Sequence, residues 1–443
     1  HKTIRARVRN SVSVGDHIKL DAAQFTGTHG GISQLSTASH LLRAGSSSLQ
    51  LVLRPVQSSN VAGDDQQFEA VVSNSSNAVV QNIEMDMLYP SGLVSRSDSE
   101  MDGADCVNSS CDPGEHITWL FGTLLPGESR SLTFASATNG ASGSLIPWSA
   151  KVFGDSVLQR RSRAFSQLSD ESLELRIEAD SLEVEAGDSF NYILSYGNTN
   201  SANATNGSLS FELPDNVTLD QAPGATVSGN NISWNLGNLI SNQLERKRVK
   251  VTLDNSTTSG TPVLVDRAHL TADSLGFEQS VSASHVVIAR PSDIHLSTRV
   301  TQGVAENAEM TITEQVVGNS GTLPLNITLD LLFPDKVLSR SELEMDGANC
   351  VNSTCDPREH SATSVTSLLP GETRSFRYTT TTANPVAEGS HSVWLSKVKT
   401  VTSDYMEKRS DTLLALSDVA PKLSVISDKL LVAPAEEYTY TFV

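Results

Sequence analysis

An internal repeat constrains the fold of this chain more than any other feature. Between residues 95–116, SRSDSEMDGADCVNSSCDPGEH, and residues 339–360, SRSELEMDGANCVNSTCDPREH, 17 of 22 positions are identical, at an offset of 244 residues. Shorter matches on both sides extend the similarity to a period of about 245 residues. A chain with such a period is expected to fold as an array of similar units packed against one another.

Each period divides into two related units. Asn74 and Pro90 are 16 residues apart in one unit, and Asn198 and Pro214 are 16 residues apart in the next. The first type has about nine extra residues, which contain a Cys-x4-Cys loop, so we call it the cysteine type and the other the plain type. We predict the end of a plain unit (1–43), a cysteine unit (44–168), a plain unit (169–289), a second cysteine unit (290–418) and the start of another plain unit (419–443), and we expect the string to continue in both directions.

Short alternating runs predict β-strands throughout. In one such run, Phe190, Tyr192, Leu194 and Tyr196 fall on one face of a strand. Turn signals recur every eight to twelve residues, and the units are about 115–125 residues long, which favours a two-sheet sandwich. We therefore predict an all-β chain of tandem immunoglobulin-like Greek-key β-sandwiches forming an elongated rod, each sandwich contacting its neighbours in sequence.

Charge and hydropathy exclude two classes of partner. The net charge of −19 and the pI of about 4.9 argue against a basic groove for nucleic acid. No apolar stretch is long enough to span a membrane. The 443 residues are too many for one hydrophobic core, which agrees with several domains.

The four cysteines form two closely spaced pairs, Cys106 with Cys111 and Cys350 with Cys355. A shared zinc site is the first alternative, but the pairs lie in separate repeats and no histidine stands at ligand spacing beside them. We therefore predict a disulfide within each pair, which implies an oxidising compartment and an extracellular or cell-surface location. The x4 spacing is not that of a C-x-x-C oxidoreductase, so a structural role is favoured over a redox switch.

The plain unit resembles a known repeat family in its motifs Val184-Glu-Ala-Gly-Asp-Ser-Phe-Asn-Tyr192, Leu213-Pro-Asp-Asn-Val217 and Trp234-Asn-Leu-Gly-Asn-Leu239. These motifs are similar to those of the repeat domain of bacterial and archaeal surface proteins known as domain of unknown function 11. The cysteine unit resembles a variant of that domain common in large secreted proteins of marine bacteria. The second cysteine unit departs from the pattern. It has Thr363 where the first cysteine unit has Trp119, and Thr366 where the first has Gly122, so we expect different sheet packing there. The resemblance implies the sandwich fold and a surface or secreted location.

Acidic residues around the cysteine loops are candidate calcium ligands, because clustered carboxylate oxygens can hold this ion. The alternative is a turn-rich hairpin that uses Asp and Gly for its backbone conformation. Asn108 and Asn352 are candidate glycosylation sites inside the loops. The candidate calcium ligands are Asp102, Asp105, Asp112, Glu115, Asp346, Asp356 and Glu359.

The four tryptophans are expected to pack in the sheet cores rather than to form sugar-binding platforms. His40 and His285 occupy matching positions near domain ends, but neither belongs to a recognisable catalytic motif, and hydrolase, zincin and P-loop signatures are absent. We therefore expect no enzyme activity and no cofactor other than the candidate calcium.

Three functions remain open. The favoured one is a non-catalytic structural segment of an extracellular surface protein, such as a stalk, an adhesin shaft or a filament subunit. Its partners would then be neighbouring copies or continuing repeats of the same protein. A binding module whose cysteine loops contact a receptor, a glycan or a neighbouring chain is the second. An accessory region of a larger secreted enzyme is the third.

Overall fold

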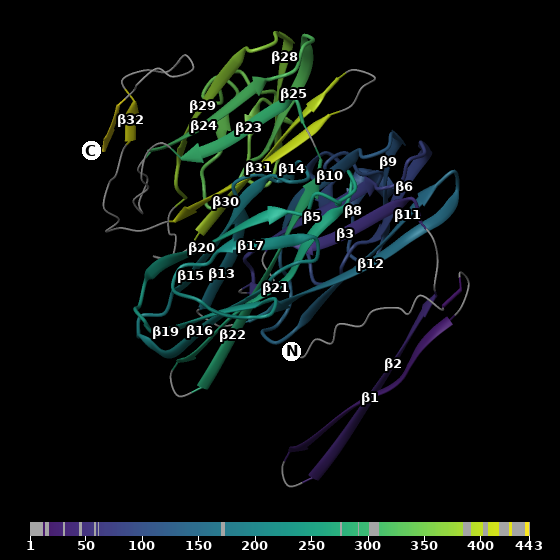
Figure 1. Cartoon of the computed structure of the whole chain (residues 1–443), viewed down its shortest axis with the longest axis vertical. Helices are drawn as coiled ribbons and strands as arrows, with labels where there is room; N and C mark the ends of the chain where they lie inside the picture. The colour runs from purple at the N-terminus through teal and green to yellow at the C-terminus, as the bar shows by residue number, and fades with distance from the viewer. Residues whose placement is uncertain are drawn as a thin grey trace. The chain divides into compact units, whose positions relative to one another are not determined.

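The described part of the chain is built almost entirely from β-strands (Figure 1). Among the described residues the only helical elements are two 3₁₀ turns, Ser99–Met101 and Val107–Ser109, which confirms the all-β prediction. No described helix has the length and apolar character needed to cross a membrane. The computed structural model describes residues 12–13, 17–29, 32–43, 47–56, 59–60, 62–169, 173–274, 277–290, 292–300, 310–383, 391–401, 406–415, 425–427 and 439–442.

The chain divides into two units, His1–Ser48 and Leu49–Val443. The first contains an antiparallel hairpin of β1 (His17–His29) and β2 (Ile32–Arg43), with a bulge between Leu20 and Ala23. The segment 1–43, expected to end a plain sandwich, thus supplies two paired strands.

The first cysteine sandwich (49–168) packs two sheets around one core. Its smaller sheet has the order β10-β5-β3, and its larger sheet has the order β4-β12-β11-β6-β9. The chain passes between sheets from β5 to β6 and from β9 to β10, as Greek-key connections do. The strands are β3 (Leu49–Pro55), β4 (Ser59–Asn60), β5 (Asp65–Asn74), β6 (Val80–Leu88), β9 (His116–Leu124), β10 (Ser129–Ala137), β11 (Leu145–Gly154) and β12 (Val157–Leu168), with the loop pair β7 (Arg96–Ser97) and β8 (Ser110–Cys111).

The plain sandwich (173–289) has sheets of order β13-β15-β20-β17 and β14-β22-β21-β16-β19-β18. The alternation predicted around Phe190 is confirmed, because Phe190, Tyr192, Leu194 and Tyr196 are all buried. The strands are β13 (Leu173–Ala179), β14 (Glu183–Val184), β15 (Ser189–Asn198), β16 (Ala204–Glu212), β17 (Val217–Gln221), β18 (Thr226–Ser228), β19 (Asn231–Leu239), β20 (Gln243–Leu253), β21 (Pro262–Ser274) and β22 (Phe277–Ala289).

The second cysteine sandwich (294–415) repeats the first in its central strands, with sheets β23-β24-β29 and β28-β25-β30-β31. A two-stranded pair, β32 (Val425–Ser427) with β33 (Tyr440–Phe442), follows in the segment expected to open a further plain unit. The strands of the sandwich are β23 (Ile294–Val300), β24 (Met310–Asn319), β25 (Leu325–Leu332), β28 (His360–Leu368), β29 (Thr373–Thr381), β30 (His391–Thr400) and β31 (Glu407–Ala415), with the loop pair β26 (Arg340–Ser341) and β27 (Thr354–Cys355).

The asparagine landmark of the repeat has a structural cause. Asn74 donates from its side-chain amide to the carbonyls of Ala78 (2.8 Å) and Leu124 (3.1 Å), which ties the end of β5 to the end of β9. Asn198 and Asn319 make the same pair of bonds in the other two sandwiches. A buried amide that satisfies two main-chain carbonyls is costly to replace, so the residue recurs at this bend.

The tryptophans lie in the sheet cores, as expected: Trp119, Trp148, Trp234 and Trp394 are 0–3% exposed. Where Thr363 replaces the tryptophan, the packing differs, again as expected. The first cysteine sandwich has one continuous apolar core, whereas the second has two separate clusters. Thr363 there shares a hydrogen bond with the hydroxyl of Tyr378, so a polar pair stands in for an aromatic contact.

Within Leu49–Val443, contacts extend beyond the expected ones between sequence neighbours. The first and second cysteine sandwiches contact each other directly, for example through the Arg409–Glu69 ion pair. The physical reason is that polar and apolar groups on the two outer sheet faces match one another, as described below. Residues 170–172, 291 and 416–422, which lie at the boundaries between the predicted units, are outside the described residues.

Candidate functional site

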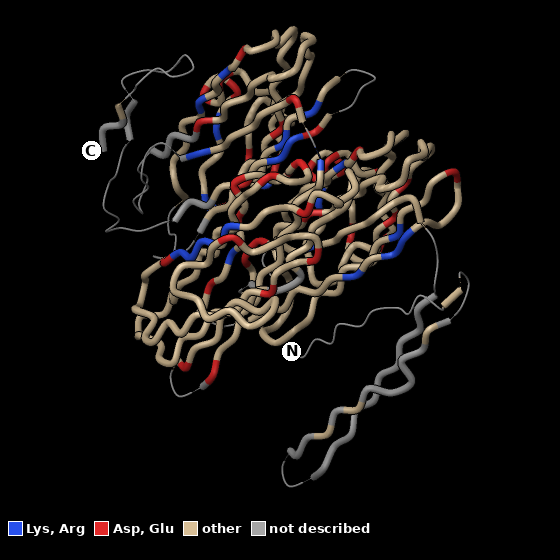
Figure 2. Tube along the Cα trace, in the orientation of Figure 1, with Lys and Arg blue, Asp and Glu red and all other residues tan. Residues whose placement is uncertain are grey.

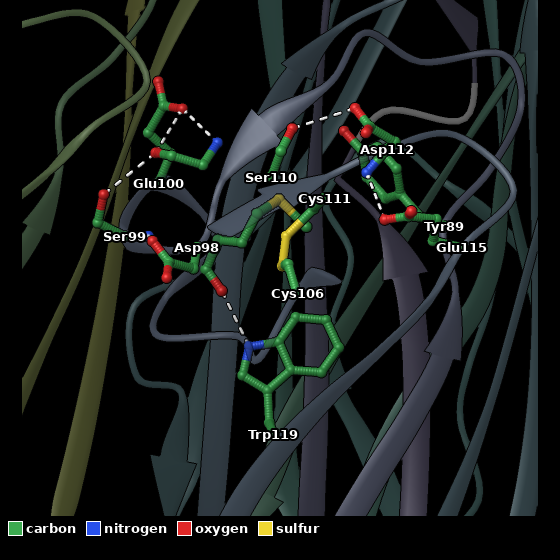
Figure 3. Close-up of a disulfide and its surroundings, with 12 residues drawn as sticks. Tyr89, Asp98, Ser99, Glu100, Cys106, Ser110, Cys111, Asp112, Glu115 and Trp119 are labelled. Atoms are coloured by element: carbon green, nitrogen blue, oxygen red, sulfur yellow. Dashed lines mark hydrogen bonds between the residues drawn. A yellow bond between two sulfur atoms is a disulfide. The ribbon is translucent and has the colours of Figure 1, made fainter. Parts of the chain in front are cut away.

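The cysteine loops are closed by disulfides between Cys106 and Cys111 and between Cys350 and Cys355 (Figure 3). Within each pair the Cα atoms are 5.0 and 5.1 Å apart, respectively. Beneath the first loop, the indole N–H of Trp119 donates to the carbonyl of Met101 at 2.9 Å (Figure 3). Each disulfide thus anchors a loop onto its own sandwich, which agrees with a structural role.

Several acidic residues of the loops serve the loop backbone. The backbone N–H of Asp112 donates to the Glu115 carboxylate at 3.2 Å, and the Ser110 hydroxyl donates to Asp112 at 3.1 Å (Figure 3). Asp356 and Glu359 repeat the first of these bonds at 3.3 Å. These carboxylates therefore stabilise tight turns, which is the alternative weighed against calcium.

One group of three potential ligands does come together among the described residues, and it differs from the predicted set. Asp102 lies with Asp330 of β25 and His360 of β28, and their ligand atoms are all within 4.8 Å of one another. Asp105 and Asp346 are exposed and lie outside this group. Of the candidate calcium ligands, only Asp102 thus belongs to the cluster.

The hydrogen bonds at this cluster fit an ion-pair network better than a metal site. Lys397 donates to Asp102 at 2.5 Å and to the carbonyl of Ser131 at 3.2 Å. His360 has Nδ1 2.8 Å from Asp330 and Nε2 2.8 Å from the carbonyl of Thr133. An imidazole with an acceptor at each nitrogen is best satisfied as the doubly protonated cation, which is not a metal ligand.

Electrostatics agree with this assignment. Burial alone would lower the pKa of His360, but the charges of Asp330 and Asp102 and the hydrogen bond to Asp330 outweigh burial and raise it. Burial likewise opposes the charged form of Lys397, and the same two carboxylates raise its pKa. Two cations therefore balance two carboxylates in this cluster, which we call the Lys397 cluster.

A second buried network centres on Arg409 of β31. Its guanidinium donates to Glu69 of β5 at 2.7 Å and to Glu183 of β14 at 2.8 Å, and its side chain is 4% exposed. Arg54 donates to the other oxygen of Glu69 at 2.6 Å. Burial alone would raise the pKa of Glu69, but the two arginines lower it from 4.5 to about 2. One arginine thus joins all three sandwiches.

An apolar contact completes the junction. Val56 and Ala135 of the first cysteine sandwich pack against Leu332, Val393 and Leu395 of the second. The cavity that remains beside Arg409 and Lys397 has room for about one water molecule. The contact between the two cysteine sandwiches therefore has the composition of a protein–protein interface, with charged networks flanking an apolar patch.

Sequence reasoning missed this interface, although a signal was present. Asp86, His116 and Lys151 recur in the second copy as Asp330, His360 and Lys397. These three polar residues lie on the outer face of a sheet in both copies, and repetition of such residues is unusual unless they contact something.

Among the remaining predicted sites, Asn108 and Asn352 are both exposed, so each could accept a glycan without unfolding the loop. His285 is fully buried beside the ring of Tyr192, and burial lowers its pKa well below the usual value. The side chain of His40 lies outside the described residues. The buried, neutral imidazole of His285 has no access to substrate.

No protein-family model matches the chain, and no curated protein sequence matches it. Solved structures with weak similarity include a protein from Corynebacterium diphtheriae described as membrane anchored, with 9% identity over 92% of this chain and 98% of that chain and a TM-score of 0.22. Elastase-activated alpha-2-macroglobulin of Escherichia coli has 10% identity over 91% of this chain and 36% of its own length, with a TM-score of 0.21. Red sea bream transglutaminase has 14% identity over 56% of this chain and 32% of its own length, with a TM-score of 0.20. At these TM-scores, none of the three carries an argument about this chain.

Proposed function

We propose that this chain is a non-catalytic structural segment of an extracellular surface protein, in which three sandwiches act as one mechanical block. The observation that carries the proposal is the position of Arg409, whose guanidinium binds Glu69 and Glu183 and so ties three sandwiches together at one point. Buried pairs of this kind resist separation, because removing one partner leaves a charge without compensation.

The extracellular location is supported by the two disulfides. A ring closed by cysteines five positions apart persists only where thiols are oxidised. The motif resemblance to surface repeat domains points to the same location. A structural role is supported by the pairing of the buried charged groups. Within the Lys397 cluster, and within the Arg409 network, the cations and carboxylates bind one another.

Calorimetry of the full chain tests the block. In wild type, we expect residues 49–415 to unfold in one cooperative transition. Arg409→Met should split this transition, because the variant leaves Glu183 without its guanidinium partner. Arg161→Met is the matched control, since Arg161 occupies the equivalent strand position in the first copy and is exposed.

At a protein concentration at which the chain is monomeric, the control should unfold as wild type does, within about 0.5 kcal/mol. Separate transitions in the wild-type chain, or the same effect from Arg409→Met and Arg161→Met, would show that the sandwiches do not form a block.

A further inference from the structure

The two cysteine sandwiches have two equivalent surfaces each, but in the contact between the sandwiches only one surface of each takes part. We call the outer face of the second copy, with Asp330, His360, Lys397 and Arg409, the docking face. We call the surface of the first copy that receives it, with Glu69, Asp102, Ser131 and Thr133, the receiving face. Among the described residues of Leu49–Val443, no other sandwich covers the docking face of the first copy or the receiving face of the second copy.

Strand register identifies the open docking face of the first copy. Lys151 pairs with Asp86 and Arg161 across neighbouring strands, and Lys397 pairs with Asp330 and Arg409 in the same way. The first copy also forms the same side-chain cluster. His116 Nδ1 is 2.6 Å from Asp86, and Lys151 donates to Asp86 at 3.0 Å.

Exposure shows that no described residue of Leu49–Val443 covers this face. Leu88 is 42% exposed, whereas its equivalent Leu332 is 1% exposed. The His116 side chain is 58% exposed, whereas that of His360 is 11% exposed. Arg161 is exposed on β12, whose basic residues are blue in Figure 2, whereas Arg409 is buried. The same apolar and charged groups are thus covered in one copy and open in the other.

On the receiving face of the second copy, Glu314 is 4% exposed, as Glu69 is, but the arginines that pair with it, Arg299 and Arg377, have side chains 62% and 66% exposed. Arg299 pairs with Glu314 in β23–β24 as Arg54 pairs with Glu69 in β3–β5. Asp346 accepts from the backbone N–H of Arg377 at 3.3 Å, as Asp102 accepts from Thr133 at 3.1 Å. The outward positions of β10 are buried, but Ser375 and Arg377, their equivalents on β29, are exposed.

We propose that the docking face of the first copy binds the receiving face of the second copy in another molecule of this chain. The two charged contacts of the internal interface then recur between molecules: Lys151 meets Asp346, and Arg161 meets Glu314. Because the two faces differ, the contact is heterologous and leaves one free face at each end. Such an interface builds an open, head-to-tail assembly.

Two features make this contact weaker than the internal one. Glu183 of the plain sandwich binds Arg409, and the proposed contact includes no counterpart of it. Arg377 stands where the first copy has Thr133, and it adds a cation that faces His116 and Lys151. Arg377→Thr should therefore strengthen the association.

The inference rests on the packing between the copies that underlies the proposed function, and a charge swap tests it. In sedimentation velocity, the wild-type chain should grow beyond 47.4 kDa as its concentration rises. Lys151→Glu and Asp346→Lys, both at positions with exposed surface, should each weaken self-association at least about tenfold, because like charges then meet.

Mixing the two variants should restore association beyond dimers, because the intact docking face of Asp346→Lys meets the intact receiving face of Lys151→Glu, and the two substituted faces also carry opposite charges. The doubly substituted chain should associate again, since opposite charges face each other once more. A wild-type chain and an Arg377→Thr chain that both stay monomeric up to their solubility limit would overturn the inference. So would single variants that associate as wild type does. If calorimetry shows the block while association fails, only the inference falls and the proposed function stands.

Discussion

The carboxylate of Glu69 offers a quantitative test of the interface between the cysteine sandwiches. In the folded chain it accepts hydrogen bonds from Arg54 at 2.6 Å and from Arg409 at 2.7 Å, and it is 4% exposed. Its pKa falls from 4.5 to about 2, because the two arginines outweigh burial. At about 1.4 kcal/mol for each tenfold change in proton affinity, this difference corresponds to about 3 kcal/mol of stability.

The sign follows from the direction of the pKa change. Because the folded-state pKa is the lower one, the contribution of Glu69 is complete above pH 4.5 and is lost as the pH falls toward 2. Glu69→Gln should therefore destabilise the chain by about 3 kcal/mol at pH 7, and the difference from wild type should shrink steadily between pH 5 and 3. Urea unfolding at a series of pH values measures both quantities.

Glu314→Gln is the matched control, because the Glu314 carboxylate is equally buried, at 5% exposed, but its partners Arg299 and Arg377 are 62% and 66% exposed. Since solvent reaches these two arginines, the ion pairs are weaker, and this variant should lose less stability than Glu69→Gln. Equal losses from the two variants, or a loss from Glu69→Gln that does not change with pH, would refute the assignment of Glu69 to a buried interface.

Two further predictions concern the loop and the Lys397 cluster. Replacing Cys106 and Cys111 by serine should lower the free energy of unfolding by about 2 kcal/mol, measured in urea, and an unchanged midpoint would show that the small ring constrains nothing. His360→Gln should destabilise the chain at pH 6 and have less effect as the pH rises. Because the pKa of His360 is raised in the folded chain, the protonated imidazole stabilises the fold below pH 6.5, the usual pKa of histidine. This contribution is lost as the pH rises through the folded-state pKa. His116→Gln, at the equivalent position with a side chain 58% exposed, should cost less stability at pH 6 than His360→Gln, and equal losses from the two variants would count against the buried cluster.

Much of the fold could be predicted because the determinants are local. Alternating apolar residues, such as Phe190 and Tyr192, set the buried face of a strand. The recurrent asparagine at positions 74 and 198 marks a bend where an amide satisfies two carbonyls. The interface could not be predicted in this way. Asp86 lies between two methionines and Asp330 between two leucines, so the two aspartates have similar apolar neighbours along the chain, but different residues lie across from them.

The comparison of Leu88 with Leu332 shows why burial of an outer face cannot be read from one copy alone. The residue type and the strand position are the same, yet one side chain is 42% exposed and the other 1%. The free energy gained by covering such a leucine is of the order of 1 kcal/mol or more, and it is available to whichever surface fits. In the proposed assembly, a repeat that places the same docking face in every copy carries the specificity for self-association, and we expect neighbouring residues such as Arg377 to adjust how strongly each copy binds.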